Sequence, residues 1–235
     1  MNIGIVVEYN PFHNGHLYQI SEAKKRLSAD IIIAVVSGDF VQRGEFSFLD
    51  KWEKTKAALD SGVDLVVELP LYYSIQNAEV FCRTAVKILD YLGTDVQVFG
   101  AETSEISKLE ELIQIQNTDS YVKLLKKYLK NGDNYSVSNF RALEEHGLGE
   151  YFSSNNILAI EYLKTIKNEN LNMKPYIIER KNTGYNAFEI NDCITSASNI
   201  RKMFFEKSLH EHRFVLPDQV YSFIENKNME DYFSI

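Results

Sequence analysis

Several common features are scarce in this sequence of 235 residues. It has two cysteines, four prolines and one tryptophan. Cys82 and Cys193 stand in no spacing typical of a metal or redox site, so we expect both to be reduced and structural. No apolar run approaches the roughly 18 residues of a membrane span. The sequence therefore predicts neither a disulfide framework nor a membrane protein.

Targeting signals and excess positive charge are missing as well. The first ten residues, MNIGIVVEYN, have no basic start and no small-residue cleavage site, so we expect no signal peptide and a cytoplasmic protein. The formal net charge is −8, which argues against a general binder of polyanions but allows one local basic patch. No pattern indicates the oligomeric state.

The remaining composition is that of a globular protein. Hydrophobic residues make up 45% and charged residues 25%, and the length suits one α/β domain with an extra lobe, or two small domains. Apolar strands are expected at 2–8, 30–37, 63–69 and 95–100, and helices between them at 14–27, 50–61 and 78–92. Continuous apolar strands alternating with helices predict a Rossmann-like α/β fold, with a parallel sheet covered on both faces.

The pattern changes near residue 105. Residues 105–168 are predicted to be helical, followed by a strand at 174–180 and helices near 198–207 and 216–225. We therefore expect a nucleotide-binding α/β catalytic domain over 1–104 and 170–207, with a helical insertion at 105–168. Residues 208–235 are expected to be the truncated start of a C-terminal helical region.

The clearest chemical signal is a histidine pair that follows the first predicted strand. His13 and His16 fall at the start of the next helix. Ligands of open parallel sheets bind beyond the carboxyl ends of the strands, and a helix N-terminus attracts phosphate. Gly15 allows close approach of the backbone to a ligand. Two imidazoles there predict stabilisation of a phosphate during phosphoryl or nucleotidyl transfer.

One simpler interpretation of these histidines stays open at this point: they can be ordinary surface or helix-capping residues. A zinc site fails for lack of further ligands, because the other histidines, His146, His210 and His212, do not complete a zinc spacing. The HEH run at 210–212 is expected on a solvated helix face. We therefore predict no metal held by protein ligands alone.

The stretch His13-Asn14-Gly15-His16 resembles the H-x-G-H signature of the nucleotidyltransferase superfamily, which forms adenylates by attack on the α-phosphate of ATP. The second signature of that superfamily, a serine-rich helix start with an arginine, is similar to ITSASNIRK at 194–202. Ser196 and Ser198 can cap the helix or bind phosphate oxygens, and Arg201 can neutralise the β- or γ-phosphate. Taken alone, such a helix start is usually only a cap.

Further segments narrow the resemblance to the tRNA(Met) cytidine acetate ligase family of bacteria. They are VEYNPFHNGH, SGDFVQRGE at 37–45, GVDLVVELP at 62–70, FGAE at 99–102 and SSNNILAIEY at 153–162. Common adenylyltransferases of small cofactors have G-x-F-D-P before the histidines, whereas this sequence has EYNPF at 8–12.

The resemblance implies a two-step reaction. Acetate attacks ATP to give acetyl-adenylate, and the wobble cytidine of elongator tRNA(Met) then takes the acetyl group as N4-acetylcytidine. We expect Mg²⁺ to arrive on the ATP phosphates. His13 and His16 are the implied catalytic residues. The implied ATP-binding residues are Val6, Val7, Glu8, Tyr9, Asn10, Pro11, Phe12, His13, Asn14, Gly15, His16, Leu17, Tyr18, Gln19, Gly100, Asn156 (or the adjacent Asn155), Arg180, Ser196, Ser198 and Arg201.

Two segments are predicted to meet the substrates. Within SGDFVQRGE at 37–45, Gln42, Arg43 and Gly44 are expected to form a flexible substrate loop. Lysines recur on one helix face in YVKLLKKYLKNG at 121–132, and Tyr121 and Tyr128 can stack on unpaired bases. The alternative for this helix is a solvated amphipathic surface. Because members of the family extend beyond this point, we expect adenylate chemistry to be retained and tRNA affinity to be reduced.

Two other functions stay open. The chain can be an adenylyltransferase for a phosphorylated small cofactor, which would need an acceptor-phosphate pocket and ignore acetate. It can also be a non-catalytic nucleotide- or RNA-binding protein, which would bind ATP without turnover.

Overall fold

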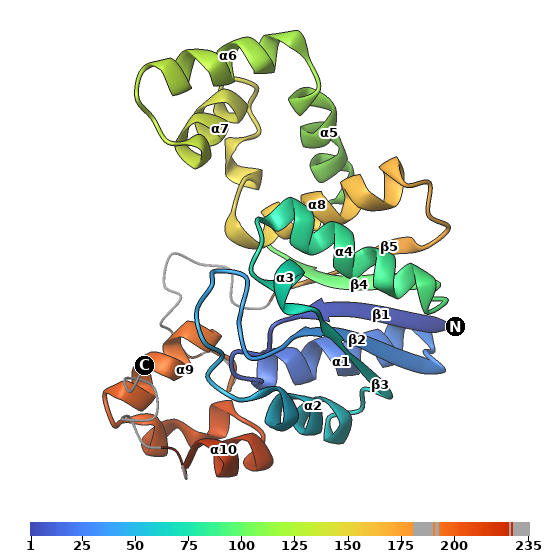
Figure 1. The fold of residues 1–235 in the computed structure, drawn as a ribbon, viewed down its shortest axis with the longest axis vertical. Helices are drawn as coiled ribbons and strands as arrows, with labels where there is room; N and C mark the ends of the chain where they lie inside the picture. The colour runs from blue at the N-terminus through green and yellow to red at the C-terminus, as the bar shows by residue number, and fades with distance from the viewer. Residues whose placement is uncertain (181–189, 191–192, 226, 228–235) are drawn as a thin grey trace.

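A five-stranded parallel sheet forms the centre of the computed structural model, which describes residues 1–180, 190, 193–225 and 227 (Figure 1). The order is β3-β2-β1-β4-β5. The strands are β1 (Asn2–Val7), β2 (Ile31–Ser37), β3 (Leu65–Leu69), β4 (Val96–Ala101) and β5 (Lys174–Glu179). The Rossmann-like parallel fold predicted from the apolar runs is confirmed.

Helices cover both faces of this sheet. The helices α1 (Asn14–Leu27) and α2 (Lys51–Asp60) share one buried cluster with the later helices α9 (Ala197–Phe205) and α10 (Asp218–Glu225). The opposite face is covered by α4 (Ala78–Tyr91) and α8 (Ser154–Asn168). The predicted helices appear within two residues of their expected bounds. A short additional helix, α3 (Leu71–Ser74), follows Pro70.

The predicted helical insertion is present between β4 and β5. It contains α5 (Ile106–Gln116), α6 (Asp119–Lys130), α7 (Tyr135–Glu144), the 3₁₀ helix η1 (Gly149–Tyr151) and α8. Helix α8 packs against α4 and β4, because it is the crossover helix that returns the chain to β5. The part that projects from the sheet in Figure 1 is therefore shorter than predicted and consists of α5, α6, α7 and η1, hereafter the helical lobe.

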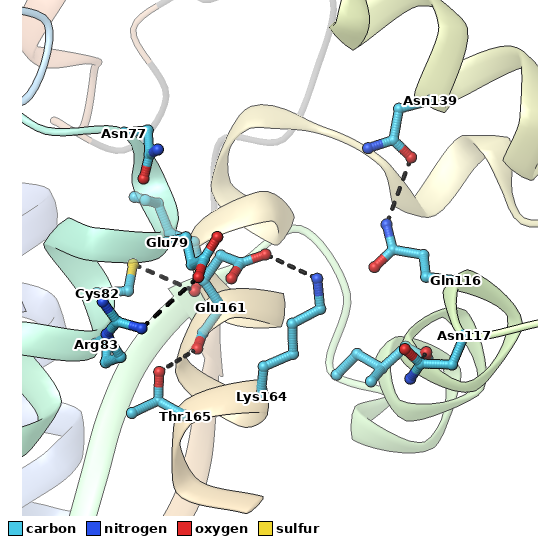
Figure 2. A network of polar contacts seen from close by, with 12 residues as sticks. Asn77, Glu79, Cys82, Arg83, Gln116, Asn117, Asn139, Glu161, Lys164 and Thr165 are labelled. Atoms are coloured by element: carbon cyan, nitrogen blue, oxygen red, sulfur yellow. Dashed lines mark hydrogen bonds and ion pairs between the residues drawn. The ribbon is translucent and has the colours of Figure 1, made fainter. Parts of the chain in front are cut away.

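Polar contacts fix the lobe and α8 in place (Figure 2). Gln116 of α5 donates a hydrogen bond to Asn139 of α7, and the buried thiol of Cys82 on α4 lies 3.8 Å from the carbonyl oxygen of Leu158 on α8. Both cysteines are free. The predicted structural role fits Cys82, which is buried, whereas Cys193 is exposed and packs in no core.

The C-terminal part differs from prediction in one detail. The HEH run lies in the 3₁₀ helix η2 (Leu209–Val215), whose helical geometry breaks at His212, and His210 is exposed beside Glu211. Helix α10 packs on α2. Lys227, which follows α10, forms an ion pair with Glu53 of α2. Most of the predicted loop after 180 and the segment 228–235 lie outside the described residues. Within the described part of the chain, no helix has the length and apolarity to cross a membrane.

Candidate nucleotide site

A large cavity opens at the carboxyl ends of the strands, where the sheet order reverses between β1 and β4. Its volume is about 1130 Å³, above the roughly 300–1,000 Å³ of a typical single-ligand pocket. It is lined by the ends of β1, β4 and β5, the loop after β2, and the starts of α1, α4 and α9. This is the position at which open α/β sheets bind ligands.

The two histidines lie at the start of α1 and line this cavity. His13 is the N-cap residue, and its Nδ1 accepts a hydrogen bond from the backbone N–H of Gly15 at 3.0 Å. The Nδ1 of His16 accepts from the backbone N–H of His13 at 3.2 Å. The capping interpretation is thus correct, but it does not exclude a ligand role. Because each Nδ1 is an acceptor, the ring proton of each neutral imidazole sits on Nε2.

Burial keeps both imidazoles neutral. His13 is only 4% exposed, and the two ring centroids are 3.9 Å apart. Burial, with a smaller contribution from Arg180, lowers the pKa of His13 to about 3. Burial, then His13 and Arg180, holds the pKa of His16 well below its usual value. At neutral pH the pair therefore offers two Nε2–H donors, without the repulsion that two adjacent imidazolium ions would suffer.

The two glycines of the site are explained by the side chains beside them. A Cβ on Gly15 would lie 2.7 Å from Cε1 of His13, so this position must be glycine for the ring to cap the helix. A Cβ on Gly100 would lie 3.3 Å from Cγ of Arg180. Gly15 was predicted to allow approach of a ligand, and the structure shows that it first makes room for a histidine.

Two arginines supply positive charge to the cavity. Arg180 follows β5, and its backbone N–H donates to the carbonyl of Ala101 at 3.1 Å. Arg201 projects from α9 and donates to the carbonyl of Asn10 at 2.6 Å, which ties α9 to the loop after β1. Burial lowers the pKa of both guanidinium groups, although arginine stays charged in proteins. The cavity therefore suits an anionic ligand.

The serine-rich segment begins α9, as predicted. Ser196 is the N-cap residue, its Oγ accepts from the backbone N–H of Asn199 at 3.1 Å, and it lies 2.9 Å from the Oγ of Ser198. Both serines line the same cavity as the two histidines. The N-termini of two helices, α1 and α9, thus face one cavity, and each favours negative charge.

Most predicted site residues line this cavity, and five do not. Those that line it are Val6, Val7, Glu8, Tyr9, Asn10, His13, Gly15, His16, Tyr18, Gln19, Gly100, Arg180, Ser196, Ser198 and Arg201. Pro11 is buried beneath the loop, while Phe12 and Leu17 pack in the core. The Asn14 amide donates to the carbonyls of Cys193 and Phe214. These four hold the loop in place instead of facing the cavity.

The asparagine assignment also changes. Asn156 is 1% exposed, and its Oδ1 accepts the backbone N–H of Glu102 at 2.9 Å. Its neighbour Asn155 lines the cavity and donates to the Glu102 carboxylate at 2.9 Å. A helix places adjacent residues about 100° apart, so only one of the two can face the ligand. In this structure that residue is Asn155.

The predicted substrate loop forms a closed turn. Phe40 and Phe46 form a β-bridge with ring centroids 4.4 Å apart. The backbone N–H of Gln42 donates to Glu8, and its side-chain amide donates to the carbonyl of Gln76. Gln42 and Arg43 line the cavity, so the loop is part of a preformed wall.

Sequence reasoning missed Lys54, the buried lysine beneath this wall. Its side chain is 0% exposed, and its Nζ donates to the carbonyls of Glu8, Ser37 and Gly38 at 3.0, 2.7 and 2.6 Å. Burial lowers the pKa of Lys54 to about 8. The available signal was its place on the inward face of α2, three residues before the buried Ala57. Lys54 joins the carboxyl ends of β1 and β2 under the cavity.

Comparison with known proteins agrees with this geometry. A family described as HIGH Nucleotidyl Transferase matches residues 1–235. The chain belongs to the HIGH nucleotidyl transferase family. The family assignment accounts for the histidine pair at the start of α1 and for the Rossmann-like sheet.

Two proteins similar to this chain are both named tRNA(Met) cytidine acetate ligase. The tRNA(Met) cytidine acetate ligase of Thermoanaerobacter pseudethanolicus is 43% identical over 224 residues, covering 92% of this chain and 56% of the relative. The protein of the same name from Fusobacterium nucleatum is 41% identical over 229 residues, covering 95% and 57%. The chain therefore spans little more than half the length of the curated relatives that it matches.

Two solved structures are also similar to this chain. A crystal structure of Thermotoga maritima TmcAL bound with alpha-thio ATP is 34% identical, with a TM-score of 0.82, covering 95% of this chain and 55% of that one. The apo form of the same protein gives a TM-score of 0.86 at 33% identity, covering 98% and 57%.

Proposed function

We propose that this chain carries the adenylate-forming site of a tRNA(Met) cytidine acetate ligase. ATP would occupy the cavity, and its phosphates would lie between the N-termini of α1 and α9. The observation that carries the proposal is the neutral histidine pair, whose Nδ1 atoms are held by backbone N–H groups so that both Nε2–H groups remain as donors. A relative at 34% identity binds an ATP analogue, which supports ATP as the nucleotide.

The proposed first step is an in-line displacement at the α-phosphorus. A carboxylate oxygen of acetate forms the new P–O bond, the bond to the bridging oxygen of the β-phosphate breaks, and pyrophosphate leaves with that electron pair. Negative charge builds on the phosphoryl oxygens, where preorganised Nε2–H donors lower the barrier. Arg201 and Arg180 are placed to balance the charge of the phosphates.

The proposed second step transfers the acetyl group to RNA. The exocyclic amine of the wobble cytidine attacks the acetyl carbonyl, AMP leaves, and the amine loses one proton. The cavity exceeds the size range of single-ligand pockets, and this supports a site that admits a base beside the nucleotide. The names of the relatives support tRNA(Met) as the acceptor.

Magnesium is proposed to arrive with ATP. Among the described residues, no group of three or more His, Cys, Asp or Glu side chains is arranged to hold a metal ion. Mg²⁺ is commonly bound through substrate phosphates with few protein ligands, so this donor set fits a metal carried by the nucleotide.

The proposal is tested by isotope exchange between ATP and pyrophosphate. Exchange that requires acetate, and that a phosphorylated pantetheine does not replace, would support the ligase. Exchange driven only by the phosphorylated compound would favour the cofactor adenylyltransferase. ATP binding without any exchange would favour the non-catalytic protein.

A further inference from the structure

The lysine-bearing side of α6 is the most concentrated positive surface of the helical lobe. All four lysines of α6 are exposed, at offsets of three, four and seven residues from the first, and we call them the α6 lysine face: Lys123, Lys126, Lys127 and Lys130. Such spacing places them within an arc of about 100° and along about 10 Å of the helix axis. The opposite side of α6 is apolar and packs into the lobe core.

These lysines differ from the other cations of the lobe. Lys108 pairs with Glu111, and Arg141 pairs with Asp133. None of the four on the α6 lysine face has a carboxylate within ion-pair distance among the described residues. An uncompensated positive strip on a chain with a net charge of −8 is a local binding surface for a polyanion.

Aromatic groups decide which polyanion fits this surface. Tyr121, predicted to stack on bases, is 4% exposed and donates to Asn139, so that prediction is wrong. The hydroxyl of Tyr128 donates a hydrogen bond to Glu145, and the cations Lys127 and Arg141 lie over its ring. Tyr135, which follows α6 after a short turn, is 63% exposed. An exposed ring that follows Lys130 by five residues can stack on an unpaired base of RNA, a contact that free phosphate or a lipid headgroup does not offer.

The lobe is continuous with the cavity. Glu150 of η1 and Asn155 of α8 line the cavity, and η1 is the part of the lobe that directly precedes α8 in the chain. The contact between Gln116 and Asn139 joins α5 to α7, so the lobe is braced from within. The 3₁₀ helix η1 therefore connects the lobe to the wall of the cavity.

We propose that the α6 lysine face and Tyr135 form an RNA-docking surface, on which lysines contact phosphates and Tyr135 stacks on an unpaired base. This inference rests on the proposed function only for the identity of the RNA. It assigns the substrate contacts to the helical lobe, at a distance from the histidine pair.

The test compares two variants of the full chain with equal charge. One changes the four residues of the α6 lysine face to Gln. The control changes four exposed lysines of the α/β domain to Gln: Lys24, Lys25, Lys56 and Lys174. A hairpin RNA with a cytidine in its loop is titrated by fluorescence anisotropy at several salt concentrations. The lobe variant should bind on the order of 100-fold more weakly at 0.1 M salt, with a salt slope smaller by about 3.

Tyr135→Ala should weaken RNA binding by on the order of tenfold, and Tyr135→Phe should restore it because the ring remains. Tyr91→Ala, at another exposed tyrosine, is the control and should have no effect. Equal affinity and salt slope in the lobe variant and the lysine control would overturn the inference. So would binding of the lobe to phosphatidylserine vesicles in preference to the RNA.

The same proteins are assayed for acetate-dependent ATP–pyrophosphate exchange. We expect both lysine variants to exchange like the wild type, since no residue of the α6 lysine face lines the cavity. Loss of RNA binding with exchange retained supports the docking surface. Exchange in the wild type without RNA binding would refute the docking surface and leave adenylate formation standing, whereas RNA binding without exchange would refute the adenylate proposal alone.

Discussion

The cavity and the helical lobe use polar side chains in opposite ways. The polar side chains in and beneath the cavity wall are hydrogen-bonded to the backbone. Backbone N–H groups donate to His13 and His16, Arg201 donates to the Asn10 carbonyl, and Lys54 donates to three carbonyls. On the α6 lysine face the cations are exposed. The cavity is therefore preorganised for a defined charge distribution, whereas the lobe surface can adapt to a flexible polyanion.

The largest effect on stability is expected at Lys54. Lys54→Met leaves three carbonyls at the base of the cavity without their donor, and we predict a loss of about 4 kcal/mol in the free energy of unfolding. Lys56→Met, on the exposed side of the same helix, should cost less than about 0.5 kcal/mol. Urea unfolding of both variants checks this, and equal losses would show that the three contacts contribute little.

The next effect is expected at Gly15. Gly15→Ala places a Cβ against the His13 ring, which should cost about 2 kcal/mol of stability and weaken ATP binding. In the double variant with His13→Ala the clash is gone, so Gly15→Ala should no longer be destabilising, because helix propensity favours Ala over Gly. A double-mutant cycle measured by thermal unfolding gives this coupling. Additive effects would mean that the ring and the added methyl group do not meet.

A smaller effect is expected from acid. The folded pKa of His13, about 3, lies below its usual value of 6.5, so the unfolded chain takes up a proton that the folded chain refuses. This contribution to stability is present above pH 6.5 and is lost as the pH falls toward 3, by about 1.4 kcal/mol per pH unit. His13→Asn keeps the cap and removes the titration. Unfolding curves between pH 7 and pH 5 should therefore be flatter for the variant, and identical pH slopes would contradict a buried neutral His13.

The smallest effect is expected in the lobe. Burial raises the pKa of Tyr121 to about 12, and its hydroxyl lies 2.5 Å from the Asn139 Oδ1. Tyr121→Phe should cost about 1 kcal/mol of stability and leave nucleotide exchange unchanged. A calorimetric scan and an exchange assay on the same sample test both parts. Loss of exchange would show that the lobe and the cavity are more tightly coupled than this comparison implies.

The parts of the molecule that periodicity controls were predictable. Continuous apolar runs gave the parallel sheet, and its carboxyl edge located the histidine pair and the start of α9, because topology alone puts these loops together. The choice between Asn155 and Asn156 was not predictable, since it depends on the rotation of α8 against β4. The role of Lys54 was also hidden, because three backbone carbonyls far apart in the sequence bind its ammonium group.

The two tyrosines of α6 were also predicted to lie on the wrong side of the helix. The lysine spacing identified the exposed side correctly, but Tyr121 and Tyr128 lie on the inward side with Leu124 and Leu125, as the same helical period requires. The contact between Phe40 and Phe46 across the loop at 37–45 was not predictable either, because composition does not reveal it.

The central claim is that neutral imidazole at the start of α1 stabilises the transferred phosphate, and His16→Gln tests it most directly. Glutamine at this position can still accept the His13 N–H through Oε1, as in an ordinary capping box, so the fold should be kept. The imidazole ring is lost, and the amide N–H₂ of glutamine then lies in a different direction from the ring Nε2–H. With His210→Ala as the control, acetate-dependent ATP–pyrophosphate exchange should fall by about 10²–10³-fold in His16→Gln alone. Exchange at the wild-type rate in a folded His16→Gln protein would contradict the account.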